Sequence, residues 1–380
     1  MELRIGPHYP TVMKVLLTAT LLFSFAFAIQ AESLPLWIGT GGNNARGIYQ
    51  TNLDTEKGSL SEPTLAVEVD GPGFLTLNAK GDRLYAVCKI GEPCVAAYSI
   101  GDDKTLTLIN SQPIGDGGAA HISIDQTDSI LFTAQYGGGS TASFPVNEDG
   151  SIGPRASLIE HSGSGPDKAR QTAPHPHFTG ISPDNRFLFV PDLGTDKVII
   201  YRINHDDSTI EPHGFGQGVP GGGPRHMKFN PDGSRIYLLN EMHLSVTVFE
   251  YDAKKGTMVA TQTIENLPEE AKEIPNKASD IHVHPSGKFV YAANRGHDSI
   301  TAFSVDKVSG ELTLIEREAI RGSWPRNFNI DPSGKWLIAA GRYSNTLSVF
   351  EIDPQSGGLS FSSNIVNCPS PICVGYAAPQ

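Results

Sequence analysis

Residues 221–241 read GGGPRHMKFNPDGSRIYLLNE and have the pattern of a β-hairpin. Apolar residues alternate in HMKF and RIYLL, and the residues NPDG separate the two runs. Proline at the second turn position and glycine at the fourth favour a tight type I turn. Arg225 and Glu241 therefore bring opposite charges to the open end of the hairpin, far from its turn.

The same hairpin recurs along the chain, at intervals of roughly 50 residues. Its copies include FLTLNAKGDRLYAV, HISIDQTDSILFTA, HFTGISPDNRFLFV, DIHVHPSGKFVYAA and NFNIDPSGKWLIAA. Aligned on their turns, the six hairpins have their anchors at Ala79, Gln126, Pro183, Pro231, Pro285 and Pro332. A second strand pair follows each hairpin, such as SVTVFEYD and then MVATQTIE. Four short antiparallel strands in each repeat are typical of a propeller blade.

The two ends of the chain supply the strands of one more blade. Leu34–Leu53 resembles the second and third strands of a repeat, and Ser370–Tyr376 aligns with a first strand. Pairing these segments closes the ring and removes an exposed sheet edge. The sequence therefore predicts an all-β, seven-bladed β-propeller of four-stranded antiparallel blades. Residues 32–380 form its single domain, and the N- and C-terminal strands close the last blade.

The N-terminal residues have the layout of a secretory signal, with a lysine, an apolar run and a small residue between Met13 and Ala31. We expect residues 1–31 to be removed, with Met13 as an alternative start, and the mature protein to be periplasmic or extracellular. It is then expected to lie outside the membrane and to be a monomer. The net charge of −12, from 29 basic and 41 acidic residues, argues against a nucleic-acid partner.

Four cysteines follow the predicted signal: Cys88, Cys94, Cys368 and Cys373. An exported chain with four cysteines allows three disulfide pairings. Cys88 and Cys94 flank a hairpin-like loop, which favours a cross-strand bond, whereas Cys373 also suits a buried thiol. Because there is no C-x-x-C pair, a structural zinc site is not expected.

Equivalent positions of the hairpins should meet at one mouth of the propeller, because antiparallel strands bring the start of the first and the end of the second to the same edge. Six residues before each anchor stand Gly73, Ala120, His177, Arg225, Ser279 and Arg326. Ten residues after each anchor stand Lys89, Tyr136, Leu193, Glu241, Arg295 and Arg342. A ring of cations around one glutamate suits an anionic ligand. A structural rim pair is the alternative, since one exposed ion pair contributes little.

The repeats and their charged residues resemble the lactonase family of seven-bladed propellers, which includes propeller-type 6-phosphogluconolactonase and carboxy-muconate cyclase. The resemblance runs from about Leu34 to the C-terminus and rests on the segments HPHFTGISPDNRFLFV, GGGPRHMKFNPDGSRIYLLNE, YAANRGHDSITAF and PSPICV. It implies catalytic roles for His177, Arg225, Glu241 and Arg295. We expect substrate contacts from Arg326, Arg342, Lys89 and Tyr136. Arg342 departs from the family pattern, in which a neutral amide is more usual, and export departs from the cytoplasmic location of the sugar-phosphate enzyme.

The resemblance implies hydrolysis of a small anionic lactone, with 6-phosphogluconolactone as the leading substrate and no metal or cofactor. Glu241 would act as the base, and His177, titrating near neutrality, would pass a proton to the departing ring oxygen. The paired histidines of PHPH and IHVH lack clustered carboxylates for a metal site, and the glycine runs lack the lysine of a phosphate loop. A lactonising cyclase and a non-catalytic propeller that binds anions or proteins are the alternatives.

Overall fold

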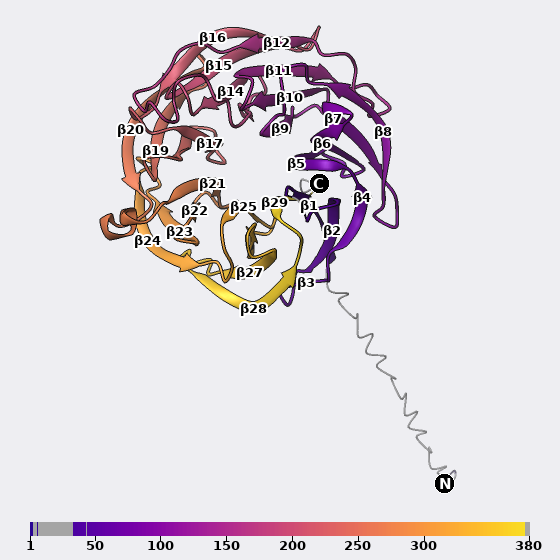
Figure 1. The fold of residues 1–380 in the computed structure, drawn as a ribbon. Coiled ribbons are helices and arrows are strands. Elements are labelled where there is room, and N and C mark those ends of the chain that lie inside the picture. The colour runs from indigo at the N-terminus through magenta and orange to yellow at the C-terminus, as the bar shows by residue number, and fades with distance from the viewer. Residues whose placement is uncertain (3–5, 7–32, 43, 377–380) are drawn as a thin grey trace. The chain divides into compact units, whose positions relative to one another are not determined.

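The computed structural model describes residues 1–2, 6, 33–42 and 44–376. Between Ser33 and Gly375 the chain forms seven antiparallel sheets arranged as blades around a central axis (Figure 1). The predicted seven-bladed β-propeller is confirmed. The described helical structure in this range is one short 3₁₀ turn, η1 (Glu269–Glu273).

Six blades are continuous in sequence, and in each the first strand is the one nearest the axis. The first two comprise β5 (Asp70–Leu77), β6 (Arg83–Ile90), β7 (Glu92–Ile100) and β8 (Leu106–Pro113), then β9 (His121–Ile124), β10 (Ile130–Gln135), β11 (Ser140–Pro145) and β12 (Ser157–Glu160). The next two comprise β13 (Gly180–Ile181), β14 (Phe187–Asp192), β15 (Lys197–Asn204) and β16 (Thr209–Gln217), then β17 (Pro224–Phe229), β18 (Arg235–Asn240), β19 (Ser245–Asp252) and β20 (Thr257–Glu265). The last two comprise β21 (Lys277–Val283), β22 (Phe289–Arg295), β23 (Ser299–Val305) and β24 (Leu312–Ala319), then β25 (Pro325–Ile330), β26 (Trp336–Gly341), β27 (Thr346–Ile352) and β28 (Leu359–Asn367).

The seventh blade joins the two ends of the propeller. Its innermost strand, β29 (Pro371–Gly375), comes from the C-terminal end and pairs with β1 (Ser33–Thr40). Strand β1 pairs in turn with β2 (Gly47–Asp54), and β2 pairs with both β3 (Ser59–Leu60) and β4 (Thr64–Glu68). The predicted closure by N- and C-terminal strands is confirmed.

The turn of the hairpin at residues 221–241 has the predicted geometry. The amide N of Gly233 donates to the carbonyl O of Asn230 over 2.9 Å, and Gly233 has a φ of 72°, which glycine adopts without steric cost. The side-chain Oδ1 of Asn230 accepts a bond of 2.7 Å from the amide of Arg235. Equivalent turn bonds join Gly81 to Asn78, Asp128 to Asp125, Asn185 to Ser182, Gly287 to His284, and Gly334 to Asp331. This shared register places equivalent residues of the six blades at the same height.

The hydrophobic core is divided into seven clusters, each between two neighbouring blades. One cluster packs Trp336 and Ile338 of β26 against Leu36 and Ile38 of β1, and so joins the sixth blade to the seventh. Every blade is therefore buried on both faces, which explains the nearly continuous apolar runs of the second strands. Closing the ring completes the last of these cores.

The cysteines lie in different places in the fold. Cys88 and Cys94 face each other across β6 and β7, with their Sγ atoms 3.7 Å apart as free thiols. A disulfide between them remains a prediction. Cys368 and Cys373 are buried thiols in two separate core clusters.

The predicted export signal, Met13–Ala31, lies outside the described residues and remains a prediction, as does the domain boundary that follows it. By its internal contacts the chain divides at this same point, into residues 1–31 and 32–380. None of the described residues belongs to a helix that is long and apolar enough to cross a membrane.

Candidate active site

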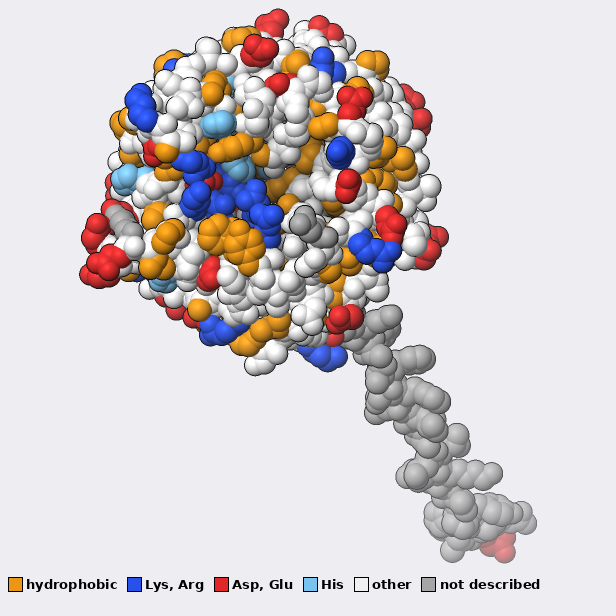
Figure 2. Space-filling view, viewed as in Figure 1, with side chains coloured by type: hydrophobic (Ala, Val, Ile, Leu, Met, Phe, Trp, Pro, Cys, Tyr) orange, Lys and Arg blue, Asp and Glu red, His pale blue; other side chains and the backbone are white. Residues whose placement is uncertain are grey.

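A cavity of about 390 Å³ opens where the first strands of several blades begin. Lys and Arg side chains gather around a hollow on this face of the propeller (Figure 2). The polar side chains that line the cavity are Tyr136, Arg170, His177, Arg225, Glu241, Lys277, Arg295 and Arg326. Five of the eight are cations, and Glu241 is the carboxylate among them.

β-Bulges place two of these arginines at the cavity. The pairing of β17 with β18 shifts between Pro224 and His226, which leaves Arg225 as the extra residue. The pairing of β25 with β26 shifts at the equivalent point and leaves Arg326 as the extra residue. A bulge turns a side chain away from the regular alternation of a strand. The repeated bulge therefore explains why positions six residues before the turn anchor point toward one mouth.

Glu241 is the centre of the charge network. It follows β18 directly, its side chain is buried, and the side chain of Arg170 reaches its Oε1 with Nη2 at 3.0 Å. Its Oε2 accepts from Arg225 Nη1 at 3.3 Å and forms an ion pair with Arg295 Nη2 at 3.0 Å. Arg225 also donates through Nε to the carbonyl O of Ser279 at 2.6 Å, and Arg295 donates to that of Ala278 at 2.7 Å. Both guanidinium groups are thus held in one orientation.

These contacts keep Glu241 ionised. Burial alone would raise the pKa of Glu241, but the attraction of Arg295 and Arg225 and the hydrogen bond from Arg170 outweigh it and lower this pKa to about 2. Removing the carboxylate would leave buried guanidinium groups facing one another, which is costly. Glu241 therefore carries its negative charge at neutral pH.

His177 behaves differently from the prediction. Burial, followed by the repulsion of Arg225, holds the pKa of His177 well below its ordinary value. Its Nε2 contacts Arg225 Nη1, and its Nδ1 is buried without a partner in the described structure. Burial beside a guanidinium keeps the imidazole neutral, so titration of His177 near neutrality is not supported, and its role in proton transfer stays a prediction.

Two lining residues, Arg170 and Lys277, were missed because both lie outside the repeated hairpin positions. Arg170 lies in the connection before β13, where a turn forms as the side chain of Asp167 accepts from the amides of Ala169 and Arg170. Lys277 begins β21, directly after the segment that contains η1. The repeats that contain Arg170 and Lys277 are longer than the other repeats, because each has extra residues in a connecting segment. That extra length was the sequence signal that could have indicated these two residues.

The remaining predicted residues are placed at different depths. Tyr136 lines the cavity, and its hydroxyl accepts from Arg170 Nη2 at 3.2 Å. Arg342 is not among the described residues that line the cavity, but its charge helps to lower the pKa of Arg326 to about 10, after the larger effects of burial and of Arg295. Lys89 is exposed at the end of β6 and is not among the described residues that line the cavity. The predicted substrate contact of Lys89 has no support in this arrangement.

The chain is similar to known proteins over most of its length. A family model described as lactonase, 7-bladed beta-propeller, matches residues 35–376. The chain belongs to this family. The fold and the predicted resemblance agree with the match, which covers nearly all of the described propeller.

Individual known proteins match this chain over most of their length. The chain is 37% identical over 345 residues to a 6-phosphogluconolactonase of Bacillus subtilis, covering 90% of this chain and 97% of that protein. It is 35% identical to a 6-phosphogluconolactonase of Formosa agariphila, covering 75% of this chain and 82% of that protein. The solved structure of a periplasmic gluconolactonase of Pseudomonas aeruginosa superposes with a TM-score of 0.85 at 29% identity, covering 92% of this chain and 100% of that one.

Proposed function

We propose that this lactonase-family protein hydrolyses an anionic sugar lactone in the cavity around Glu241, with 6-phosphogluconolactone as the leading substrate. The observation that carries this proposal is the charge balance of the cavity, in which five cations face one carboxylate. Burying like charges together is unfavourable unless a ligand of opposite charge compensates them. A phosphorylated lactone supplies both the anion and the reactive ester.

The arginines and Lys277 would hold the substrate. A guanidinium offers paired donors that match phosphate or carboxylate oxygens. Repulsion within the cavity supports this role, since burial and the charge of Arg170 lower the pKa of Lys277. A bound anion would relieve that repulsion, and one guanidinium would also stabilise the oxyanion that forms at the attacked carbonyl.

Glu241 would move the proton. An ionised carboxylate offers about four lone-pair directions, and the hydrogen bonds from Arg170 and Arg225 use two of them. A remaining direction can accept a proton from water as the water oxygen attacks the lactone carbonyl carbon. When the ring C–O bond breaks, Glu241 returns this proton to the ring oxygen and yields the open hydroxy acid. Its low pKa makes Glu241 a modest base but a ready acid in the second step.

His177 would serve as a positioning residue in this scheme. Its Nε2 accepts from Arg225, whose guanidinium also contacts Glu241. Export to the periplasm or outside the cell stays part of the proposal, and the relative named as a periplasmic gluconolactonase supports it.

The test is a hydrolysis assay of the purified mature protein with 6-phosphogluconolactone and with unphosphorylated gluconolactone, after subtraction of spontaneous opening. We expect the phosphorylated lactone to have the higher kcat/KM. Glu241→Gln should lower turnover per folded molecule about 100- to 10,000-fold. Melting curves of both proteins give the folded fraction, because this variant also removes a buried partner of the arginines.

Two results would count against the proposal. Full turnover by folded Glu241→Gln would remove the catalytic role of the carboxylate. Absence of hydrolysis with either lactone, while an anion such as inorganic phosphate still raises the melting temperature, would instead favour the non-catalytic alternative.

A further inference from the structure

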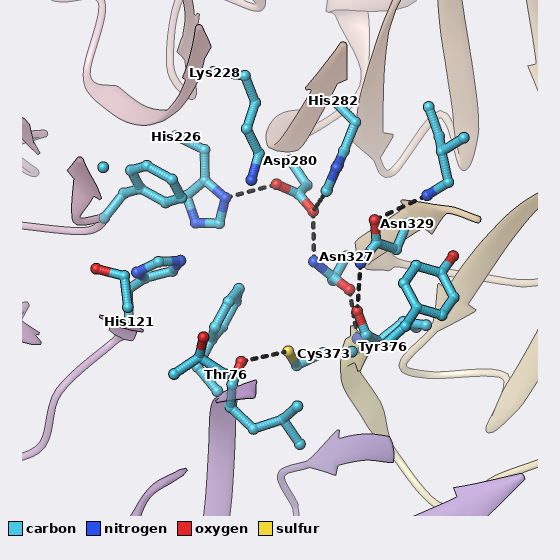
Figure 3. Close-up of a pocket in the computed structure, with 18 of the residues that line it drawn as sticks. Thr76, His121, His226, Lys228, Asp280, His282, Asn327, Asn329, Cys373 and Tyr376 are labelled. Atoms are coloured by element: carbon cyan, nitrogen blue, oxygen red, sulfur yellow. Dashed lines mark hydrogen bonds and ion pairs between the residues drawn. The ribbon is translucent and has the colours of Figure 1, made fainter. Parts of the chain in front are cut away.

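Asp280 lies in a second cavity, of about 660 Å³, along the axis of the propeller (Figure 3). Its carboxylate is buried and accepts from His226 Nδ1 at 2.7 Å, from His282 Nε2 at 3.1 Å and from Asn327 Nδ2. Figure 3 shows these side chains converging on the carboxylate, His282 from its own strand β21 and His226 and Asn327 from the two neighbouring blades. The lactonase chemistry proposed above does not use this group.

Asp280 determines which nitrogen of His226 carries a proton. Despite its burial, the neighbouring His282 and His226 and the hydrogen bonds that they donate hold the pKa of Asp280 well below its ordinary range, so this carboxylate only accepts. His226 Nδ1 must then be the donor. Burial lowers the pKa of His226 to about 4, so this imidazole is neutral at pH 7 and its Nε2 is an acceptor.

The opposite end of the network determines the protonation of His177. A guanidinium has donors and no acceptor, so His177 Nε2 accepts from Arg225 Nη1. In a neutral imidazole the proton is then on Nδ1. Each of the two histidines therefore has one nitrogen left over, a donor on His177 and an acceptor on His226, and both atoms are buried without a partner in the described structure.

The two rings are in contact. Their centroids are 5.3 Å apart with an angle of 62° between the planes. His226 is held in this position by Phe178, whose centroid is 4.9 Å away, and by Phe74 at 5.9 Å. The free donor and the free acceptor thus belong to adjacent, immobilised rings, and burial makes it costly to leave either unpaired.

We propose that Asp280 is a positioning residue that acts through His226 and His177 on Arg225. His177 Nδ1–H donates toward His226 Nε2 through one water that bridges the two nitrogens. Every donor from the Arg225 guanidinium to the Asp280 carboxylate then points the same way, which strengthens each bond of the chain. These hydrogen bonds link the guanidinium that contacts Glu241 to the Asp280 carboxylate of the next blade. The effect of this hydrogen-bonded chain on catalysis rests on the proposed function. The direction in which its hydrogen bonds point does not.

The test is ¹⁵N NMR of the full chain labelled at histidine, with His177→Gln and His226→Phe used to assign the two resonances. We expect both neutral histidines to carry their proton on Nδ1. In Asp280→Asn the amide can donate to His226, so we expect His226 to move its proton to Nε2 and the resonances of His177 to shift. His282→Gln is the matched control, because it contacts the other oxygen of Asp280, and should leave the tautomers of His177 and His226 unchanged.

Activity supplies a second measurement. Asp280→Asn should displace the Arg225 guanidinium and so lower kcat/KM for the phosphorylated lactone about 10- to 100-fold. His282→Gln should change kcat/KM little. If Asp280→Asn does not fold, His226→Phe tests the same link through the resonances of His177. A proton on Nε2 of His177 in the unaltered protein, or unchanged His177 and His226 resonances in folded Asp280→Asn, would overturn the proposal even if no lactone is hydrolysed.

Discussion

Arg170 holds the Oε1 oxygen of Glu241 from a loop that lies outside the repeated hairpins. Its contact differs from those of Arg225 and Arg295, which both meet Oε2 and are themselves buried. Arg170 is partly exposed, so its guanidinium can move toward a ligand with less loss of protein contacts. The three arginines together lower the pKa of Glu241 against the effect of burial. A bound anion that moves an arginine away from Glu241 would therefore raise the pKa of this carboxylate.

Arg170→Met removes the guanidinium that contacts Oε1 of Glu241. Removing one cation should raise the pKa of Glu241 from about 2 toward its ordinary value. A reaction that needs the carboxylate loses rate as pH falls through this pKa, so the variant should lose kcat/KM at a higher pH than the unaltered protein. Hydrolysis rates between pH 3 and 7 measure the shift.

The matched control is Arg186→Met, because Arg186 pairs with Asp184 at the surface and does not line the cavity. Its pH profile should coincide with that of the unaltered protein. An Arg170→Met profile that also coincides would show that Arg170 does not influence the catalytic group.

At the scale of single elements, β29 is the strand on which closure of the ring depends. Its residues Cys373 and Val374 are buried in two different clusters, one on each side of the seventh blade. The backbone of Val374 also accepts from Asn329 Nδ2 and donates to Asn327 Oδ1 in the sixth blade. One short strand therefore supplies packing to two inter-blade cores.

Deletion of residues 370–380 should lower the melting temperature strongly and broaden the transition, because it removes the strand that completes both cores. Deletion of residues 377–380 alone is the control and should leave melting unchanged. Melting curves followed by circular dichroism distinguish the two. Equal melting of both truncated proteins would contradict a closing role for β29.

For the whole molecule, buried histidines make stability depend on pH. Burial lowers the pKa of His121 and His177 well below the ordinary value, lowers that of His226 to about 4, and also lowers that of His282. In the unfolded chain these groups titrate near 6.5. The unfolded state therefore binds more protons below this pH, and stability must fall as pH falls.

We expect the free energy of unfolding to decrease from pH 7 to pH 5, with each such histidine contributing a slope of up to about 1.4 kcal/mol per pH unit. Glu241 adds nothing in this window, because its contribution is lost only as pH falls below about 4.5 toward 2. Urea unfolding at several pH values measures the slope. His121 lies outside the proposed chemistry, so His121→Asn should reduce the slope by the contribution of one histidine, up to about 1.4 kcal/mol per pH unit. A free energy of unfolding that does not change with pH would contradict the prediction.

The repeated hairpins determined the architecture of the lactonase-family chain, because turn residues and alternating apolar positions are local signals that recur in every blade. They also brought His177, Arg225, Glu241, Arg295 and Arg326 to one mouth, since equivalent positions in a propeller share a height. Only the tertiary structure added Arg170 and Lys277, which lie in segments without a repeat register. It also showed that Lys89 is exposed, that burial beside Arg225 lowers the pKa of His177, and that Asp280 contacts His226, whose ring lies against that of His177. The reason is that pKa values and hydrogen-bond polarity depend on burial and on the distances between side chains of different blades, which no local pattern in the sequence specifies.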